Sequence, residues 1–504
     1  MTINMDTVNC ESGKLSAVMV IFGGTGDLTH RKLIPALYNL IHDSLMPQCF
    51  SVVCIGRRDM TDEQYREQIF ESLKKFSRNK IDDTLWGRLR ELIHYYKFDF
   101  TDERGYKGLK EYLDEVDGGA GTSGNRIFYL AVAPEYFEMI VHGLHVSGLS
   151  SNRGDSWSRL IIEKPFGKDL STARKLNNKL LEVFPENSIY RIDHYLGKEM
   201  IQNIMVLRFC NSVFESLWSS KYIDNIQISL TEKNGVGSRG GYYESSGAVR
   251  DMVQNHILQI LSLVAMEPPV NLDTDSIRTE KLKVIQAIEE FTPELLRDNV
   301  VFGQYGTGVV NGDEVPAYRQ EEKVPRDSST ETFAALKLHI NNFRWAGTPF
   351  YIRTGKRLAT GSAEIVVQFK PLPDILYFKS GHVQEPNLLV IRIQPNVGVF
   401  FQFNTRNFSS HNEIVPSKMD SSHISPTQGN TPEAYERLIH DMLRGDSTLF
   451  SRWDEVEASW SFADKIIGYR EQKKSRFPNY AAGTMGPIAA FKLLAREGRE
   501  WWDI

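Results

Sequence analysis

The first third of the chain alternates short apolar runs with amphipathic segments. The apolar runs have the length of buried strands and lie at residues 16–22, 50–55, 94–98, 126–132 and 159–162. Between them, apolar residues recur at three- and four-residue steps, which is helical periodicity. The predicted helices include residues 33–45, 62–75 and 134–145. Strands that alternate with helices predict a mostly parallel sheet of the α/β class.

After about residue 203 the pattern changes to alternating apolar and polar positions. The stretches that show it are 225–231, 333–340, 364–369, 387–393 and 398–403. Alternation is typical of half-buried antiparallel strands, and several of these runs have no crossover helix between them. We therefore expect a large, mainly antiparallel open sheet of an α+β domain. A helix over 242–256, continuing to 266, should face that sheet.

The chain length favours two domains, because one hydrophobic core rarely serves 504 residues. We predict a Rossmann-like dinucleotide-binding domain at 16–190 and a larger domain at 191–504. The polar segment 1–15 is predicted to be disordered. The Gly/Ser-rich stretch 118–124 and the Ser/Pro-rich stretch 415–429 are predicted loops.

Charge and cysteine content exclude several classes of protein. A net charge of -5 gives no overall basic surface, so nonspecific nucleic-acid binding is not expected. The first residues lack the basic start and apolar core of a signal peptide, and no apolar run is long enough to cross a membrane. The cysteines form no Cys-x-x-Cys pair, which predicts neither a disulfide framework nor a metal site and fits a reducing cytoplasm; they are Cys10, Cys49, Cys54 and Cys210.

A glycine-rich turn follows the first predicted strand directly. Glycine leaves the backbone open, so that a dinucleotide pyrophosphate can reach the amides at the start of the next helix. The candidate coenzyme-binding residues are Gly23, Gly24, Thr25, Gly26, Asp27 and Leu28. Thr29 stands where the usual pattern has its third glycine, so a tight turn without function is an open alternative.

The second predicted strand ends in Gly56, Arg57 and Arg58. In a dinucleotide fold this strand end meets the adenosine ribose. An acidic residue there favours NAD, whereas arginine favours the extra phosphate of NADP. We therefore predict NADP as the coenzyme, with Thr25 as a second donor to its phosphate. Asp59 just beyond keeps NAD open, and two exposed arginines without function are the alternative.

The run from Arg191 to Asn203 places many polar groups at the start of a predicted helix. Asp193 is predicted to cap that helix, and His194 and Lys198, four residues apart, to share one of its faces beside Tyr195. Helix-start amides, an ammonium, an imidazole and a phenol would suit a phosphate dianion. The Asp193 carboxylate would repel it, so we expect it to turn away and orient another polar group. A solvated helix start is the competing interpretation.

Arg-Ile-Asp-His-Tyr-Leu-Gly-Lys-Glu, residues 191–199, resembles the signature of the glucose-6-phosphate dehydrogenase family. The other stretches that resemble the family are 23–37, 163–167, 348–358, 432–439, 445–450 and 454–458, the last three of which we expect to be helical. The resemblance implies oxidation of D-glucose 6-phosphate at C1 by NADP, the first oxidative step of the pentose phosphate pathway, giving 6-phospho-D-glucono-1,5-lactone and NADPH. It also implies a cytoplasmic homodimer or dimer of dimers, with no nucleic acid or membrane as partner.

The resemblance assigns the catalytic pair. His256 matches the base, and Asp193 matches its partner. Histidine titrates near neutral pH, so it can accept the hydroxyl proton while hydride leaves for the nicotinamide. A carboxylate bonded to one imidazole nitrogen holds the tautomer and leaves the other nitrogen as the base. From position alone, His256 is equally a satisfied core histidine between Met252 and Ile260.

The resemblance also assigns the binding residues. The residues expected to bind substrate are Lys164, His194, Tyr195, Lys198, Glu232, Asp251, Lys356 and Arg357. Lys164 and Lys32 are also expected to contact the coenzyme, and the Lys164-Pro165 bond is predicted to be cis. From position alone, a surface residue before a turn is an equally open interpretation of Lys164. The role of Arg357 stays open, because Gly361 stands where many members carry a second basic residue.

Two other functions are weighed against this one. A sugar oxidoreductase of the glucose-fructose oxidoreductase type also combines a dinucleotide domain, an open sheet and a Glu-Lys-Pro motif, but would lack the 191–199 signature. A non-catalytic NADP-sensing regulator would have lost the base or phosphate residues, and none is missing here. We expect no second coenzyme site, because the regions around 361 and 501–504 lack its basic pattern.

Overall fold

The computed structural model describes residues 15–152, 154–373, 375, 385–407, 413–422, 433–473 and 475–504. The chain forms two compact units. Unit 1 comprises the residues up to Gly197 together with Leu272–Arg278 and 425–457, and unit 2 comprises the rest. A segment from far along the sequence therefore belongs to the first unit. The predicted disorder of 1–15 lies, except for Leu15, outside the described residues.

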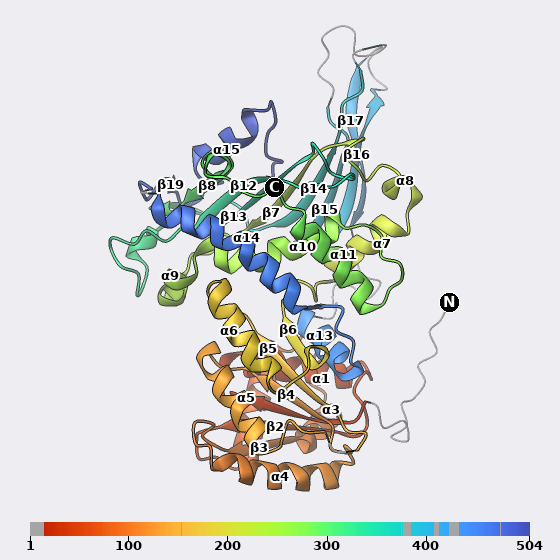
Figure 1. Cartoon of the computed structure of the whole chain (residues 1–504), viewed down its shortest axis with the longest axis vertical. Coiled ribbons are helices and arrows are strands. Elements are labelled where there is room, and N and C mark those ends of the chain that lie inside the picture. Colours follow the sequence, from red (N-terminus) through yellow and green to blue (C-terminus); the bar gives the residue numbers. More distant parts are fainter. Residues whose placement is uncertain are drawn as a thin grey trace. The chain divides into compact units, whose positions relative to one another are not determined.

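Unit 1 is built on a seven-stranded sheet in the order β18-β6-β5-β4-β1-β2-β3 (Figure 1). The first six strands in sequence pair in parallel, and only β18 is antiparallel, to β6. The strands are β1 (Ala17–Phe22), β2 (Phe50–Gly56), β3 (Ile93–Lys97), β4 (Arg126–Leu130), β5 (Ser158–Glu163), β6 (Ile189–Ile192) and β18 (Phe450–Ser451). The central strands β1, β2 and β4 are buried throughout, which explains their continuous apolar runs.

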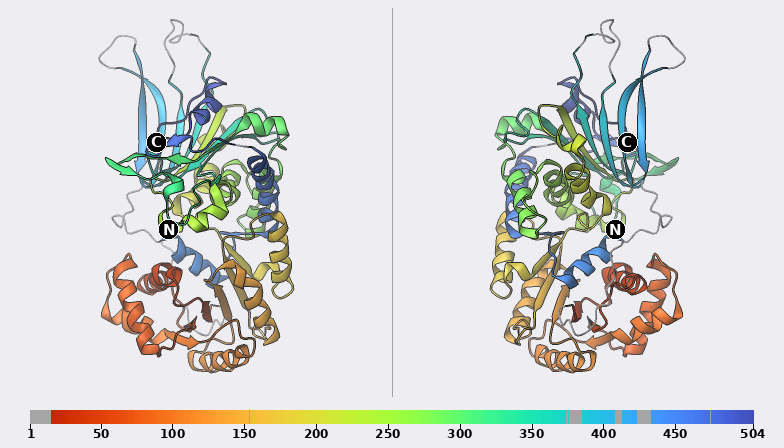
Figure 2. Two further views of the ribbon diagram at one scale, coloured as in Figure 1. Left: turned by 90° about the vertical axis from the view of Figure 1, so that its left-hand side faces the viewer. Right: turned by 90° about the vertical axis from the view of Figure 1, so that its right-hand side faces the viewer.

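Helices pack on both faces of this sheet, as Figure 2 shows for the red-to-yellow part of the chain. The helices wholly in unit 1 are η2 (Thr29–Leu33), α1 (Ile34–His42), α2 (Asp62–Phe76), α3 (Asp83–Leu92), α4 (Gly105–Ala120), η3 (Pro134–Tyr136), α5 (Phe137–Val146), α6 (Leu170–Leu181), η4 (Glu186–Ser188) and α13 (Ala434–Arg444). Residues of α1, α2, α3 and α13 share one apolar cluster with β1, β2 and β5. The parallel α/β prediction is confirmed.

Unit 2 is built on an eight-stranded sheet in the order β17-β16-β15-β14-β7-β13-β12-β8. All neighbouring pairs are antiparallel except β7 and β13. The strands are β7 (Ile223–Thr231), β8 (Val300–Gly303), β12 (Phe333–His339), β13 (Pro349–Gly355), β14 (Ala363–Phe369), β15 (Leu388–Gln394), β16 (Gly398–Arg406) and β17 (Ile414–Ser422). The prediction of a mainly antiparallel open sheet is therefore confirmed. Short strand pairs flank it: β10 (Gly308–Val310) with β11 (Asp313–Val315), and β9 (Tyr305–Gly306) with β19 (Tyr480–Ala481).

Helices η6, α10 and α7 belong to unit 2. Helix η6 packs against β7 and β13 of the sheet, and α10 contacts both η6 and α7. The helices of this unit are α7 (Glu199–Phe209), α8 (Ser212–Glu215), η5 (Gly237–Arg239), α9 (Gly240–Ala248), η6 (Val249–Ile257), α10 (Leu258–Ala265), α12 (Pro293–Asn299), η7 (Tyr318–Gln320) and α15 (Ile488–Ala495). Helices α11 (Thr274–Gln286) and α14 (Trp453–Gln472) contribute residues to both units.

The predicted helix over 242–266 is interrupted at Gly247. The φ of Gly247 is +65°, outside the helical region, and a Cβ there would lie 2.3 Å from Glu331 Oε1. The buried Glu331 carboxylate thus occupies the space a side chain would need. The segment after the break, η6, is a π-helix, in which hydrogen bonds join residues five apart instead of four.

Several other local predictions are wrong. Leu45 lies beyond the end of α1, so the first predicted helix is shorter than its apolar pattern. Residues 118–120 belong to α4 instead of a loop. Residues 414–422 form strand β17, so the 415–429 loop is wrong there and its remainder lies outside the described residues. Residues 445–450 are not helical but lead into β18.

Most of the 348–358 stretch that resembles the family is strand, because β13 spans Pro349–Gly355. The cysteine prediction is also corrected: Cys49 is disulfide-bonded, whereas Cys54 and Cys210 are free. No helix among the described residues is long and apolar enough to span a membrane.

Candidate active site

The coenzyme loop connects β1 to η2 in unit 1, and its glycines are required by close packing. Gly23 has a φ of +92°, and a Cβ there would lie 2.4 Å from the carbonyl oxygen of Ala131. A Cβ on Gly24 would lie 2.7 Å from that of Cys54. Both positions therefore exclude side chains. The turn lies at the carboxyl end of β1, between its neighbours β4 and β2, where open α/β sheets bind ligands.

Thr29 explains the missing third glycine. Its hydroxyl donates to the Gly23 carbonyl at 3.0 Å, and the amide of Gly26 donates to the same oxygen at 2.9 Å. The side chain of Thr29 is buried and closes the turn. The following segment η2 is a π-helix, a geometry that is frequent at functional sites.

Thr25 and the end of β2, both predicted to bind the ribose phosphate of NADP, lie side by side. A Cβ on Gly56, at the end of β2, would lie 3.1 Å from Thr25 Cγ2, so Thr25 stands beside this strand end. Arg57 follows it and is exposed. Asp59, the residue that kept NAD open, is ion-paired with Lys97 at 3.2 Å. The local charge available to a ribose phosphate is therefore positive.

The two other predicted charges of this loop have protein partners. Asp27 pairs with Arg31 at 3.0 Å, with both side chains largely exposed. Lys32 donates to Glu433 Oε2 at 2.7 Å, and both side chains are 44% exposed. Glu433 directly precedes α13, so this pair joins the start of α13 to η2, the helix that follows the coenzyme loop. Such exposed pairs are weak and can open for a ligand.

The signature segment folds differently from its prediction. Asp193 is not a helix cap: its Oδ1 accepts from the Tyr195 amide at 3.0 Å, and its carbonyl accepts from the Leu196 amide at 3.0 Å, which makes a turn. The helix α7 begins only at Glu199, with Lys198 extended at its N-cap. His194 and Lys198 therefore do not share a helix face. The structure assigns His194 to unit 1 and Lys198 to unit 2.

Packing at Gly197 gives the reason for this difference. A Cβ on Gly197 would lie 2.8 Å from the Ala434 carbonyl oxygen and 2.9 Å from the Ala434 Cβ. The chain must pass close to the start of α13 before the helix can begin. Within the turn, the rings of His194 and Tyr195 lie 5.0 Å apart, and Asp193 is 2% exposed.

Arg191, the first residue of the signature, has a structural role. Its guanidinium is buried and donates to both carboxylate oxygens of Glu186, at 2.7 and 2.9 Å, and to Asn177 Oδ1 at 2.6 Å. These contacts fix the end of β6 to α6. The basic residue is thus saturated by protein acceptors, and it holds the strand from which Asp193 emerges.

The Glu-Lys-Pro motif follows β5, and the Lys164-Pro165 bond is cis as predicted. Glu163 Oε1 accepts from Tyr129 at 2.6 Å and from Tyr435 at 3.1 Å. Burial raises the pKa of Glu163, while the two phenols and the Lys164 charge lower it and Asp193 raises it further. The sequence analysis missed Glu163 and its tyrosines, although their motifs were noted.

In unit 2, Lys356 stands between two carboxylates that were predicted to bind the sugar. Its ammonium lies 2.6 Å from Glu232 Oε1 and 3.7 Å from Asp251 Oδ2. It also lies over the ring of Tyr243, 5.4 Å from the centroid. Glu232 directly follows the last residue of β7 and so lies at a strand end. Three residues from separate parts of the sequence thus form one polar cluster.

The π-helix η6 carries both Asp251 and His256. In a π-helix the hydrogen bonds join residues five apart, so these two side chains lie about one turn from each other. In an α-helix the same spacing would point them in different directions. His256 is 1% exposed. The π geometry therefore places the predicted base one turn along from the Lys356 cluster.

The two remaining predicted residues of unit 2 also have partners. Lys198 donates to Gln394 Oε1, at the end of β15. Arg357, with a φ of 54°, lies 3.3 Å from Glu321 Oε1. Its nearest charge is therefore an acid, which weakens it as a binder of phosphate.

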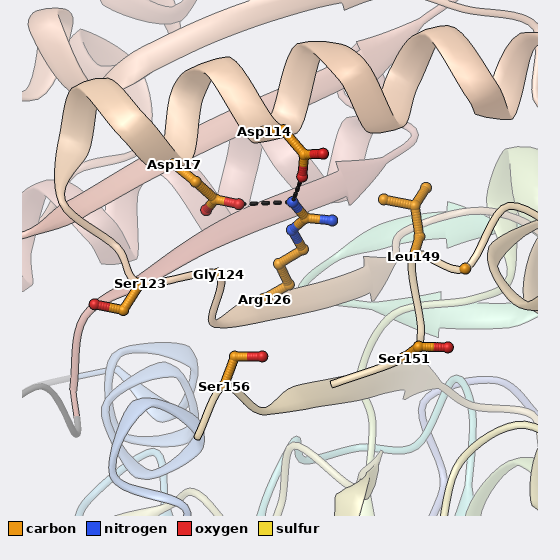
Figure 3. A pocket seen from close by; sticks show the side chains of 9 residues that line it. Asp114, Asp117, Ser123, Gly124, Arg126, Leu149, Ser151 and Ser156 are labelled. Atoms are coloured by element: carbon orange, nitrogen blue, oxygen red, sulfur yellow. Dashed lines mark hydrogen bonds and ion pairs between the residues drawn. The ribbon is translucent and has the colours of Figure 1, made fainter. Parts of the chain in front are cut away.

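Two cavities of unit 1 lie apart from these groups. One of about 320 Å³ lies at the amino ends of β4 and β5, where Arg126 donates to Asp114 and Asp117 at 2.6 Å each (Figure 3). The other, of about 440 Å³, is lined by residues of α5 and α6. No predicted site residue is among the described residues that line either one. The 320 Å³ cavity lies at the amino ends of the strands, whereas the coenzyme loop lies at their carboxyl ends.

Fold and local geometry together define a class: an oxidoreductase with a Rossmann-type coenzyme unit and a mainly antiparallel second unit. Residues 20–203 match the family model for the glucose-6-phosphate dehydrogenase NAD binding domain, and residues 205–502 match that for its C-terminal domain. The chain belongs to the glucose-6-phosphate dehydrogenase family. The alternative of a glucose-fructose oxidoreductase type is not favoured.

Similar proteins cover nearly the whole chain. Glucose-6-phosphate 1-dehydrogenase of Bacillus subtilis (strain 168) is 47% identical over 488 residues, which are 97% of this chain and 98% of the relative. The enzyme of Chlamydia pneumoniae is 46% identical over 491 residues, 96% of this chain and 95% of the relative. A solved structure described as glucose-6-phosphate dehydrogenase in complex with its substrate glucose-6-phosphate has a TM-score of 0.88 at 34% identity, covering 97% and 99% of the two chains.

Proposed function

We propose that this chain transfers hydride from C1 of D-glucose 6-phosphate to NADP, giving 6-phospho-D-glucono-1,5-lactone and NADPH. The observation that carries the proposal is the match of both family models, over residues 20–203 and 205–502. Unit 1 binds the coenzyme and unit 2 contributes the sugar-binding cluster. NADP, when bound, accepts the hydride at C4 of its nicotinamide.

The coenzyme loop provides the binding side of the reaction. Gly23 and Gly24 keep the backbone open for the pyrophosphate, and Thr25 and Arg57 bind the ribose phosphate. Lys32 exchanges its exposed pair with Glu433 for a coenzyme phosphate. The exposed arginines at the end of β2, Arg57 and Arg58, support NADP over NAD, because they offer positive charge to the ribose phosphate.

His256 acts as the base that removes the proton from the C1 hydroxyl. Its imidazole is held by the Asp193 carboxylate, which stabilises the imidazolium formed during the reaction. The deep burial of both residues supports this role, because an electrostatic partner has a larger effect away from water. As the proton leaves, C1 can release its hydride and become the lactone carbonyl.

The remaining residues hold the substrate. His194, Tyr195 and Lys198 bind its phosphate by charge-assisted and phenolic hydrogen bonds. The other substrate residues contact the sugar and are Lys164, Glu232, Asp251 and Lys356. The cluster of Lys356 with Glu232 and Asp251 supports this, since it offers both donors and acceptors to hydroxyl groups. A substrate contact of Arg357 stays a prediction.

An absorbance assay at the NADPH band tests the proposal and separates the alternatives. Purified chain is mixed with NADP and either glucose 6-phosphate or unphosphorylated sugars. Rapid NADPH formation with glucose 6-phosphate alone is expected. Equal turnover of free glucose would favour another sugar oxidoreductase, and coenzyme binding without turnover would favour a sensing regulator.

Assembly and location are part of the proposal. We propose a homodimer or dimer of dimers that uses the broad, mainly antiparallel sheet of unit 2. Measuring the mass in solution by light scattering tests it, and a monomer at micromolar concentration would refute it.

We also propose a cytoplasmic location, because the charged substrate and coenzyme do not readily cross a hydrocarbon layer. The cysteine pattern no longer supports a reducing cytoplasm, because Cys49 is disulfide-bonded.

A further inference from the structure

Helix α13 comes from a segment more than two hundred residues after the coenzyme unit's last parallel strand, yet its first residues contact three site segments of unit 1. We call residues 433–436 the α13 start. Glu433 pairs with Lys32 of η2, the helix that follows the coenzyme loop, at 2.7 Å. Ala434 packs against the backbone of Gly197, directly after the Asp193 turn. Tyr435 donates to Glu163, next to Lys164, at 3.1 Å.

The α13 start is itself rigidly held. Glu436, the fourth residue, is 2% exposed. Its carboxylate accepts from Asn39 of α1 at 2.8 Å and from Arg78 Nε at 2.9 and 3.0 Å. These buried, charge-assisted bonds join α13 to the helix that follows the coenzyme loop. The start of α13 therefore cannot shift without breaking a buried network.

Helix α13 is also fastened along β5. Side chains two apart on a strand share a face, so Arg159, Ile161 and Glu163 all point toward this helix. Arg159 Nη1 donates to the Leu443 carbonyl at 2.9 Å, at the far end of the helix. Glu163 binds Tyr435 at the near end, and Ile161 packs in the same apolar cluster as residues of α13.

We propose that Tyr435 is a positioning residue for the reaction: its phenol holds the Glu163 carboxylate and, through it, the ammonium of Lys164. The charges of Lys164 and Asp193 both act on Glu163, one favouring its ionised form and the other opposing it. The carboxylate in turn attracts the Lys164 ammonium. A second phenol, Tyr129, donates to the same oxygen from β4 at 2.6 Å. The inference rests on the proposed role of Lys164.

The test is Tyr435→Phe in the full chain, which removes one hydroxyl and keeps the ring. The expected result is a kcat about tenfold lower, the size of one hydrogen bond to a charged group, with a smaller change in KM. The acid limb of the kcat/KM profile should also move to higher pH. The phenol favours ionised Glu163, so its loss raises the pKa of that carboxyl and activity is lost earlier on acidification.

A matched control and a double variant make the test specific. Tyr106→Phe removes another buried phenol of unit 1, one that donates to the Phe100 carbonyl at 3.0 Å, and should leave kcat and the pH profile unchanged. In a Glu163→Gln background, Tyr435→Phe should produce no further shift of the acid limb, because the two groups act as one unit.

The inference is overturned if Tyr435→Phe matches Tyr106→Phe in kcat and pH profile, or if its effect is undiminished in the Glu163→Gln chain. If Tyr435→Phe does not fold, Tyr129→Phe, which removes the other phenol from Glu163, must shift the acid limb in the same direction. The rate of the unaltered chain is measured first. Failure there refutes the proposed function, whereas an active chain with indifferent variants refutes only the role of Tyr435.

Discussion

His256 combines deep burial with a position on the π-helix η6, one turn along from Asp251. If a buried histidine served only packing, replacing it by asparagine would lower stability but leave the rate of the folded enzyme nearly unchanged. A base cannot be replaced in this way, because asparagine does not accept a proton near neutral pH. A substitution at His256 therefore tests which of the two interpretations that its sequence position left open is correct.

Replacing His256 by Asn should lower kcat for glucose 6-phosphate by on the order of a hundredfold or more, with a modest change in KM. Steady-state kinetics with NADP measure both constants. His145→Asn, on the exposed end of α5, is the control and should keep the normal rate. Near-normal turnover by the His256 variant would contradict its assignment as the base.

Lys198→Gln should act on binding. Removing a charged donor to the phosphate is expected to raise KM for glucose 6-phosphate by roughly 10- to 100-fold, with a smaller effect on kcat. The slow reaction with free glucose should not change, since that sugar has no phosphate. Initial rates with both sugars check this, and an equal loss with both would mean that Lys198 serves the fold.

At the scale of elements, Gly247 breaks the helix directly before η6, the segment that carries Asp251 and His256. Gly247→Ala should destabilise the chain by about 2 kcal/mol or more, because its φ is positive and its Cβ would meet Glu331. Thermal unfolding measures the loss. The control is Gly118→Ala in α4, where nothing lies within 4 Å of the added Cβ and stability should hold or rise slightly. Equal melting temperatures for the two variants would contradict the clash.

Elements with strong periodicity could be predicted from the sequence. The continuous apolar run of β1 identifies a strand because both of its faces are buried. The sequence of β7 alternates, but its polar side chains are buried as well, so the half-buried strand predicted over 225–231 is wrong about its burial. Strands β6 and β18 span only four and two residues, too few for any period to show. Their existence depends on the sheet beside them.

Contacts between distant residues could not be predicted in the same way. The π-helical geometry of η6 follows a break at Gly247 that depends on Glu331, far along the chain. The helix cap assigned to Asp193 failed because Gly197 must pass close to Ala434. The resemblance supplied the identity of the site residues, but no local pattern could show that Tyr435 reaches Glu163.

For the whole molecule, pH should change stability through a partly buried acid of α13. Burial, aided by Asp446, raises the pKa of Asp441 to about 7. The unfolded chain ionises this group at a lower pH, near 3.8. Between these values the folded state binds more protons, so rising pH costs stability, and the full cost is present above about pH 7.

Asp441→Asn should therefore raise the melting temperature by a few degrees at about pH 8.5, and by clearly less at about pH 5. The amide cannot ionise, so it removes a cost that exists only on the alkaline side. Scanning calorimetry at the two pH values checks the difference. A gain that is the same at both, or a loss at about pH 8.5 alone, would contradict a raised pKa for Asp441.

The central claim is that hydride passes from C1 of glucose 6-phosphate to NADP. Glucose 6-phosphate carrying deuterium at C1 tests it most directly, with the NADPH analysed by mass spectrometry. The account predicts that every NADPH formed carries the deuterium and is one mass unit heavier. NADPH without deuterium, or no NADPH at all, would contradict it.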